Sequence, residues 1–182
     1  MNDWLNTWFS QLPELNFAQV VGLFSFALGI LCFYQKDDRR LKITMVIMSV
    51  NHAIHFALLG AVTACLGAVL AVIRTGLSLK TSSKIVAYGF IGLTVLWGAY
   101  LAAAWQDMLP IVGSCIGTYS LFCLSGIRMR IGFLFGACFW LANNILIGSI
   151  GTTLLEMTLI IVNLSTITRL YFSNPPSSKN PH

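Results

Sequence analysis

Apolar residues occur along the chain in long runs, and short segments between the runs carry most of the charge. A membrane-spanning helix needs about 20 mostly apolar residues, with a range of about 17 to 25. The pattern therefore predicts an all-α integral membrane protein with seven transmembrane helices. We expect these crossings at residues 15–34, 41–59, 62–79, 85–104, 109–125, 131–147 and 152–172.

The run from Leu41 to Leu79 is too long for a single crossing. A helix of that length would extend about 60 Å at 1.5 Å per residue, about twice the thickness of the hydrocarbon layer. The segment GAVT at 60–63 is the most suitable place for the chain to turn back. The run therefore contributes two helices.

The composition also favours a membrane protein. Of the 182 residues, 57% are hydrophobic and only 9% are charged, compared with roughly 25% charged residues in soluble domains. So few charges cannot cover the surface of a soluble protein of this size. The net charge of +5 does not indicate a nucleic-acid partner, because the basic residues occur in short clusters between apolar runs.

The basic residues all lie on one side of the predicted bundle, whereas Asp3, Glu14 and Asp107 lie on the other side. Because cytoplasmic loops are enriched in Lys and Arg, we expect the N-terminus outside and the tail at 173–182 in the cytoplasm. The residues that support this orientation are Lys36, Arg39, Arg40, Lys42, Arg74, Lys80, Lys84, Arg128, Arg130, Arg169 and Lys179.

The segment before the first crossing, MNDWLNTWFSQLPEL, contains no Lys or Arg. It therefore lacks the positive region that begins a signal peptide. Its large apolar residues recur at helical spacing, which predicts a short helix in the membrane interface, with a disordered leader as the alternative. These residues are Trp4, Leu5, Trp8, Phe9 and Leu12.

The sequence contains no pattern typical of an enzyme. The five cysteines lie within apolar runs and form no metal-binding spacing, so we expect them to be packing residues. Metalloprotease, nucleophile-elbow and phosphate-loop motifs are absent, as are paired carboxylates in the crossings. His52 and His55 form only a weak metal signal, because no Cys, Asp or Glu lies near them in the same segment. We expect no catalytic residues, no metal and no cofactor.

A weak internal repeat relates residues 15–79 to residues 109–172. Val21-Gly22 aligns with Val112-Gly113, Cys32 with Cys123 and, after a shift of three residues, Gly60 with Gly148. Because three crossings end on the opposite side of the membrane, a linker helix at 85–104 lets the two three-helix units point the same way. Parallel repeats of this kind occur in transporters, with the substrate site at the repeat interface.

Four segments carry a resemblance to a known family: IHFALLG at 54–60, IRTGLSLKT at 73–81, LPIVGSCIGTYSLFC at 109–123 and GSIGTTLLEMTLIIVN at 148–163. With them the chain resembles the YgjV family of bacterial inner-membrane proteins over nearly its whole length. The 3+1+3 plan also resembles the SWEET sugar transporters and the PQ-loop and nicotinamide-riboside carriers. The resemblance implies one membrane domain, residues 1–182, in the bacterial inner membrane, and it implies no particular substrate.

The sequence departs from the sugar carriers in its prolines. The carriers that this chain resembles use a proline within the first helix of each unit as a gating kink. Here Pro13 precedes the first crossing and Pro110 opens the fifth, so neither lies within a span. Glycines can supply flexibility instead, or can allow close helix packing; the candidates are Gly22, Gly29, Gly113 and Gly117.

Polar residues within the crossings are candidates for a solute site. Asn51, His52 and His55 lie on one helix face, because they are three or four residues apart. Trp140, Asn143 and Asn144 repeat this spacing, and the repeat pairs His52 with Trp140 and His55 with Asn143. Rings and amides from both units can stack on a flat solute and form hydrogen bonds with it. The alternative is hydrogen bonding between helices.

Three further residues carry charge or hydrogen-bonding groups into the predicted spans. Glu156 is the only acidic residue in an apolar run, and Asn163 lies close to the same face. Glu156 can bind a cation or a proton or pair with a histidine; the alternative is a carboxylate that reaches the interface. Arg74 either reaches the cytoplasm or closes the inner side of a pathway.

Together these features predict a small-solute transporter in which two three-helix units rock about a midplane site. A non-transporting membrane receptor or assembly protein is the alternative. The lipid bilayer and a small polar solute are the expected partners, and the sequence defines neither the solute nor an oligomeric state. The expected lining consists of His52, His55, Trp140, Asn143, Asn144, Glu156 and Asn163.

Overall fold

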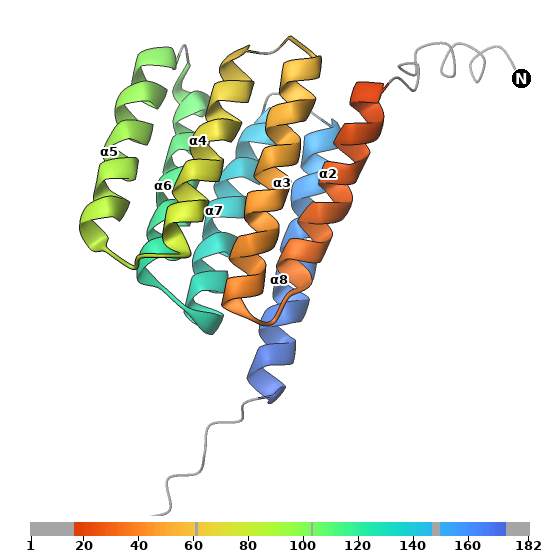
Figure 1. Ribbon diagram of the computed structural model, residues 1–182, viewed down its shortest axis with the longest axis vertical. Helices are drawn as coiled ribbons and strands as arrows, with labels where there is room; N and C mark the ends of the chain where they lie inside the picture. The colour runs from red at the N-terminus through yellow and green to blue at the C-terminus, as the bar shows by residue number, and fades with distance from the viewer. Residues whose placement is uncertain (1–16, 61, 103, 147–149, 174–182) are drawn as a thin grey trace, which may run out of the picture.

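A computed structural model describes residues 17–60, 62–102, 104–146 and 150–173. Within these residues the chain forms seven α-helices, as the apolar runs predict (Figure 1). The predicted interfacial helix before residue 13 lies outside the described residues. The helices are α2 (Phe17–Tyr34), α3 (Asp38–Leu58), α4 (Val62–Ser78), α5 (Lys84–Leu101), α6 (Met108–Cys123), α7 (Gly126–Leu146) and α8 (Ile150–Ser173), with a short 3₁₀ helix η1 (Trp105–Asp107) before α6.

The helix boundaries lie within a few residues of the predicted crossings, and the largest difference is at α7. That helix begins at Gly126 rather than at residue 131, because the basic turn GIRMR is already helical. Helix α3 likewise begins within the charged segment. The Asp37 carboxylate caps it by accepting a hydrogen bond from the Arg40 amide at 2.7 Å. Apolar runs indicate where a helix lies in lipid, and caps determine where it begins.

The chain turns back between α3 and α4 at the predicted place. Helix α3 ends at Leu58, and Gly60 has a φ angle of 69° in the turn that follows. This left-handed conformation is common just after a helix and favours glycine, which lacks a Cβ atom. The long run from Leu41 to Leu79 therefore forms two helices, α3 and α4.

Among the residues that the structure describes, four helices are long and apolar enough to cross a membrane. They span Asp38–Leu58, Lys84–Leu101, Gly126–Leu146 and Thr153–Ser173. The apolar stretches Val20–Tyr34 in α2 and Cys65–Ser78 in α4 are shorter. The structure therefore supports a helical membrane protein with several crossings.

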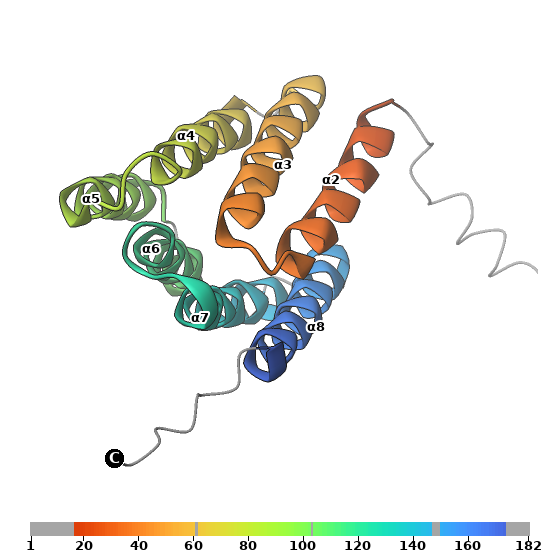
Figure 2. The ribbon, with the colours of Figure 1, turned by 60° about the horizontal axis from the view of Figure 1, so that its bottom comes forward.

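The helices form a closed ring in which neighbours in sequence usually pack together (Figure 2). Helix α3 packs between α2 and α4, and α7 packs between α6 and α8. Helix α5 packs against α6, and α4 also contacts α6. The first and last helices, α2 and α8, lie side by side and close the ring. We refer to α2–α4 as the first unit and to α6–α8 as the second unit.

All described Lys and Arg residues lie in or near the turns at one end of the bundle, which we call the basic end. This end contains the α2–α3, α4–α5 and α6–α7 turns and the end of α8, at the bottom of Figure 1. The apolar core also lies toward the basic end, because its residues come from the helix turns nearest to it. This core consists of Cys32, Leu41, Ala87, Leu121, Phe122, Met129 and Phe133.

Candidate functional site

Asn51 joins the first two helices of the first unit. Its side-chain amide donates hydrogen bonds to the Val21 carbonyl oxygen at 2.8 Å and to the Ser25 hydroxyl oxygen at 2.6 Å. Asn51 is half-buried on α3, and Ser25 is buried on α2. The amide therefore serves here as a link between helices.

The two predicted site histidines lie one turn from each other on α3 and are both half-buried. Both imidazole rings lie near the Phe56 ring, with centroids 5.9 Å away for His52 and 5.4 Å away for His55. The His55 ring also packs against Gly22 of α2, where an added Cβ atom would lie 3.0 Å from Cε1. Gly22 thus makes room for this ring between the two helices.

The second predicted set lies on α7, where the two asparagines are buried and Trp140 is 38% exposed. The Trp140 ring covers Gly113 of α6, where an added Cβ atom would lie 3.0 Å from Cδ1. The Asn143 side-chain oxygen is buried and accepts no hydrogen bond from the described residues. A buried amide oxygen without a donor is costly in an apolar bundle. Of the α7 residues, Asn143 is therefore the strongest candidate to contact a solute.

The third predicted set lies on α8. Glu156 is half-buried, and Asn163 is only 2% exposed. The Asn163 amide donates a hydrogen bond to the Arg130 carbonyl oxygen of α7 at 2.9 Å, whereas its side-chain oxygen has no partner among the described residues. Asn163 therefore joins α7 to α8 and keeps one acceptor available.

The predicted residues lie on helices α3, α7 and α8. Helix α3 packs against α2 and α4, while α7 packs against α6 and α8. The two sets therefore occupy different units, and their convergence on one solute remains a prediction.

Sequence reasoning missed a polar network at the basic end, centred on Arg130 of α7. The Arg130 side chain is fully buried. Its Nη2 donates to the Lys36 carbonyl oxygen at 3.0 Å and lies 3.5 Å from the Asp38 carboxylate. The other carboxylate oxygen of Asp38 accepts a hydrogen bond from the Gly126 amide at 2.5 Å. The one available signal was Asp37-Asp38, the only acidic pair among the basic turns.

Two further basic side chains extend this network. Lys42 Nζ donates to the carbonyl oxygens of Ser78, at 3.2 Å, and Leu121, at 2.7 Å. These carbonyls belong to the last turns of α4 and α6, where a positive charge is favourable. Arg74 Nη1 donates to the Thr118 hydroxyl oxygen at 3.0 Å. Arg74 therefore links α4 to α6, and its place beside a pathway remains a prediction.

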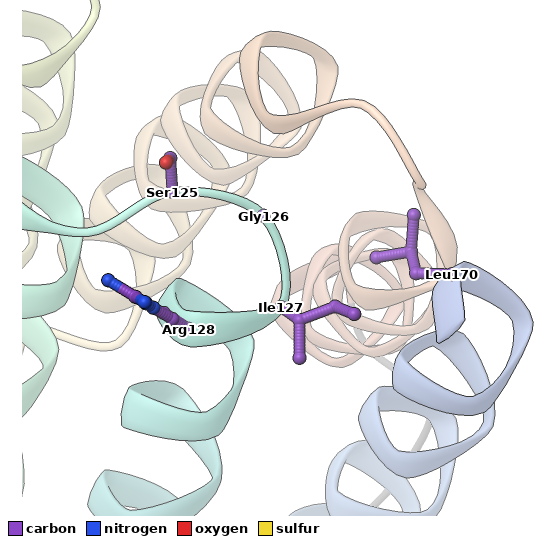
Figure 3. Close-up of a pocket in the computed structure, with 5 residues that line it drawn as sticks. All are labelled: Ser125, Gly126, Ile127, Arg128 and Leu170. Atoms are coloured by element: carbon purple, nitrogen blue, oxygen red, sulfur yellow. The ribbon is translucent and has the colours of Figure 1, made fainter. Parts of the chain in front are cut away.

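A pocket of about 370 Å³ lies at the basic end, between the start of α7 and the end of α8 (Figure 3). Ile127 and Leu170 face each other across it, whereas Arg128 points away from Leu170. Ser125 and Gly126 complete its lining. None of the predicted site residues lines this pocket.

The described residues contain no cluster of three or more His, Cys, Asp or Glu side chains that could hold a metal ion. The five cysteines are free thiols, and Cys32 donates a hydrogen bond to the Leu41 carbonyl oxygen at 3.4 Å. The chemistry of the site is therefore that of amides, imidazoles, hydroxyls and one carboxylate. Such groups suit the binding of a polar solute by hydrogen bonds.

Comparison with known proteins identifies the family. The family model described as "Bacterial inner membrane protein", Imp-YgjV, matches residues 16–174. The chain is 36% identical over 154 residues to "Inner membrane protein YgjV" of Escherichia coli (strain K12), which covers 85% of this chain and 84% of that relative. No solved structure matches. The match covers every described helix, and the chain belongs to the YgjV family of bacterial inner-membrane proteins.

Proposed function

We propose that this protein transports a small polar solute across the bacterial inner membrane. The observation that carries this proposal is the pair of buried side-chain oxygens of Asn143 and Asn163, which accept no hydrogen bond from the described residues. Lipid supplies no donor, so an unpaired acceptor within a bundle is costly. Polar groups retained inside a membrane commonly mark a substrate or ion pathway. Asn163 lies beside Arg130 near the basic end, and Asn143 lies thirteen residues further along α7, about 20 Å away. A solute with hydrogen-bond donors would therefore satisfy the two oxygens in turn as it moves along the bundle.

The contacts of two aligned glycines support a transporter built from two like units. Gly22 in the first helix of the first unit packs against the His55 ring from the second helix. Gly113, its partner in the repeat, packs against the Trp140 ring from the corresponding helix. This correspondence supports a 3+1+3 arrangement like that of SWEET transporters, with α5 as the linker. Only Ala87 of α5 is buried, as suits a connecting helix that faces lipid.

We propose that the basic end faces the cytoplasm. Lys and Arg are retained on the cytoplasmic side of membrane proteins, and all described basic residues lie at this end. The end of α8 is then cytoplasmic, and the start of α2 is periplasmic. Helix α7 would present its asparagines from its last turn, at the end of the helix opposite the basic turns.

Each residue of the proposed site has a role that follows from its chemistry. His52, His55 and Trp140 would stack on a flat face of the solute, and Asn143 and Asn144 would bind its polar edge. Asn163, beside Arg130, would bind the solute at a second position closer to the basic end. Glu156 would attract a cationic group or carry a proton. This assignment involves binding and release, so we propose no catalytic activity, cofactor or metal.

A membrane receptor or assembly protein is the second candidate, and the bonds of Asn51 and Asn163 favour it. Both side chains join neighbouring helices, as polar residues do when they stabilise a membrane bundle by about 0.6–2 kcal/mol per contact. Under this interpretation the bundle supports a complex and carries no solute.

Uptake into proteoliposomes tests the proposal. The purified protein is reconstituted and offered a panel of radiolabelled sugars, nucleosides and amines. We expect uptake of one class above protein-free liposomes, and we expect Asn143→Leu to reduce that uptake at least tenfold, because it replaces the candidate acceptor. Thr168→Val is the matched control, because Thr168 is an exposed polar residue that bonds only within α8. Folded protein that takes up no member of the panel would favour the receptor or assembly role.

A further inference from the structure

The two units are joined by hydrogen bonds that cluster at the basic end. The central joint connects the turn after α2, the start of α3 and the start of α7. Arg130 reaches from the second unit to the Lys36 carbonyl and the Asp38 carboxylate, and Asp38 in turn accepts from the Gly126 amide. One buried guanidinium and one carboxylate thus join segments about ninety residues apart in the chain.

A second joint lies on the neighbouring side of the ring. Lys42, from α3 of the first unit, donates to the carbonyl of Leu121 on α6 of the second unit. Arg74, from α4, donates to the hydroxyl of Thr118 on the same helix. Both cations therefore reach across the boundary between the units.

Two outer contacts complete the connection near the end of α8. Lys36 Nζ donates to the Ser173 hydroxyl oxygen at 2.7 Å, and Arg169 donates to the Tyr34 carbonyl oxygen at 3.3 Å. The Arg169 guanidinium also lies 4.0 Å from the centroid of the Tyr34 ring. These contacts are exposed, so we expect them to contribute less than the two inner joints, whose hydrogen bonds are partly buried.

Side-chain packing, like the hydrogen bonds, is concentrated at the basic end. The buried residues of α3 are Leu41, Thr44 and Ser49, and none lies in the last nine residues of the helix, which point away from the basic end. From residue 50 to residue 59 every side chain of α3 is half-buried or exposed. The apolar core that includes residues of both units also lies at the basic end. The structure is therefore closed at the basic end and less tightly packed along α3 toward the other end.

The polar joints have the character of contacts that can open. Arg130 Nε and Nη1 and Arg74 Nε are buried without partners among the described residues, so the network is only partly satisfied. Partly satisfied buried networks are less stable than complete ones. The joints also lie near the helix ends, where water can replace the lost hydrogen bonds when the units separate.

We propose that Asp38, Lys42, Arg74 and Arg130 form a polar latch between the units, and that the structure represents the state closed at the basic end. Release of the latch opens this end and makes the space between the units accessible from the basic side. The link to alternating access depends on the proposed transport function, whereas the latch itself concerns the interface alone.

Distance measurements between pairs of spin labels test the latch in the full chain, reconstituted in lipid nanodiscs. The five native cysteines are first replaced by alanine. One pair of labels is placed at Arg39 and Arg128, exposed residues in the first turns of α3 and α7. A second pair is placed at Leu59 and Leu146, exposed residues at the other ends of α3 and α7. The two pairs therefore report on the two ends of the same helices.

The test variant combines Asp38→Asn, which weakens the central joint with Arg130, and Lys42→Met, which weakens the second joint with the Leu121 carbonyl. We expect a longer-distance population between residues 39 and 128, with the ratio of open to closed molecules increased about tenfold or more, because the lost hydrogen bonds involve charged groups. Lys80→Met is the matched control, since Lys80 is an exposed basic residue at the same end and its described hydrogen bond is made by its backbone. If the double variant does not fold, Lys42→Met alone is measured in the same way.

The two label pairs separate the latch from the transport function. Opening at the basic end with a shorter distance between residues 59 and 146 supports both the latch and a rocking transporter. Opening at the basic end alone supports the latch and counts against rocking. An unchanged distance between residues 39 and 128 in the folded test variants overturns the latch, whatever the uptake experiments show.

Discussion

At the residue scale, the main feature is a charge that the apolar pattern assigns to a loop and the fold buries. Arg130 is fully buried and depends on Asp38 and on backbone carbonyls for its partners. A buried ion pair contributes little relative to apolar residues of similar volume, but removal of one partner leaves an uncompensated charge. The pair is therefore important mainly through the cost of breaking it.

Asp38→Ala is expected to destabilise the protein by about 3 kcal/mol, because it leaves the Arg130 guanidinium buried without a counter-charge. The double variant Asp38→Ala with Arg130→Met is expected to be more stable than Asp38→Ala alone. Unfolding in detergent monitored by circular dichroism gives both values. Asp37→Ala serves as a control that removes the α3 cap, at a cost of about 1 kcal/mol, and a weaker attraction to Arg130, while Asp38 stays in place. Equal stability of Asp38→Ala and the wild type would mean that Arg130 finds other partners or water.

At the element scale, close approach of α6 and α7 depends on paired glycines. An added Cβ atom at Gly113 would lie 2.7 Å from the Gly136 carbonyl oxygen, and one at Gly136 would lie 2.9 Å from the Gly113 carbonyl oxygen. Backbone atoms cannot move aside as flexible side chains can. Small residues at helix interfaces allow this kind of packing in membranes, so the packing interpretation of Gly113 explains its contacts in the structure.

Gly113→Ala and Gly117→Ala form a matched pair on α6. Gly113→Ala is expected to lower the free energy of unfolding by about 1–3 kcal/mol, because it forces α6 and α7 apart. Gly117→Ala is expected to be neutral or stabilising, because no atom lies within 4 Å of the added methyl group and alanine favours helix. Thermal unfolding in one detergent measures both variants. A loss of stability for Gly117→Ala equal to that for Gly113→Ala would show that helix packing does not determine the difference.

The helices also show how much of this fold the sequence can predict. Apolar runs predict all seven helices, because burial in lipid requires a length that only a few segments reach. The turn at Gly60 was also predictable, because the run from Leu41 to Leu79 exceeds the bilayer. The start of α7 was not, because the turn GIRMR is charged, and the Asp38 carboxylate that accepts from its Gly126 amide lies 88 residues earlier in the chain.

The candidate site was predictable only in part. Polar residues within apolar runs identified Asn143, Asn144 and Asn163, and the structure buries all three. The partner of Asn163, the carbonyl of Arg130, lies 33 residues away, and pattern alone cannot pair two such positions. The role of Arg130 was missed for the same reason, because burial of a charge depends on which distant segment packs over it.

At the scale of the whole molecule, the ring has one strongly basic end and one end without described Lys or Arg residues. The summed field of these charges gives the bundle a fixed polarity with respect to the membrane. Because the chain passes through the bundle an odd number of times, the start of α2 and the end of α8 lie at opposite ends of the bundle (Figure 1).

Single cysteines at Arg39, Lys80 and Arg128 are expected to share one side of the membrane. In a cysteine-free background, a membrane-impermeant maleimide should label them in inside-out vesicles and leave them unlabelled in intact spheroplasts. Trp105→Cys is the opposite-side control, because Trp105 is 67% exposed in the turn before α6. Labelling of the Arg39 and Arg128 positions from different sides would contradict both the seven-helix topology and the latch.

The contact between α2 and α8 has a consequence for biosynthesis. Gly29 of α2 makes room for the Leu159 side chain of α8, at 3.2 Å from an added Cβ atom. That partner is synthesised more than one hundred residues later, on the order of ten seconds at roughly 5–20 residues per second. Until then α2 packs against α3, but its face toward α8 has only lipid, the translocation machinery or an insertion factor as its neighbour. Ring closure therefore comes last, and premature termination would leave this seam uncovered in the membrane.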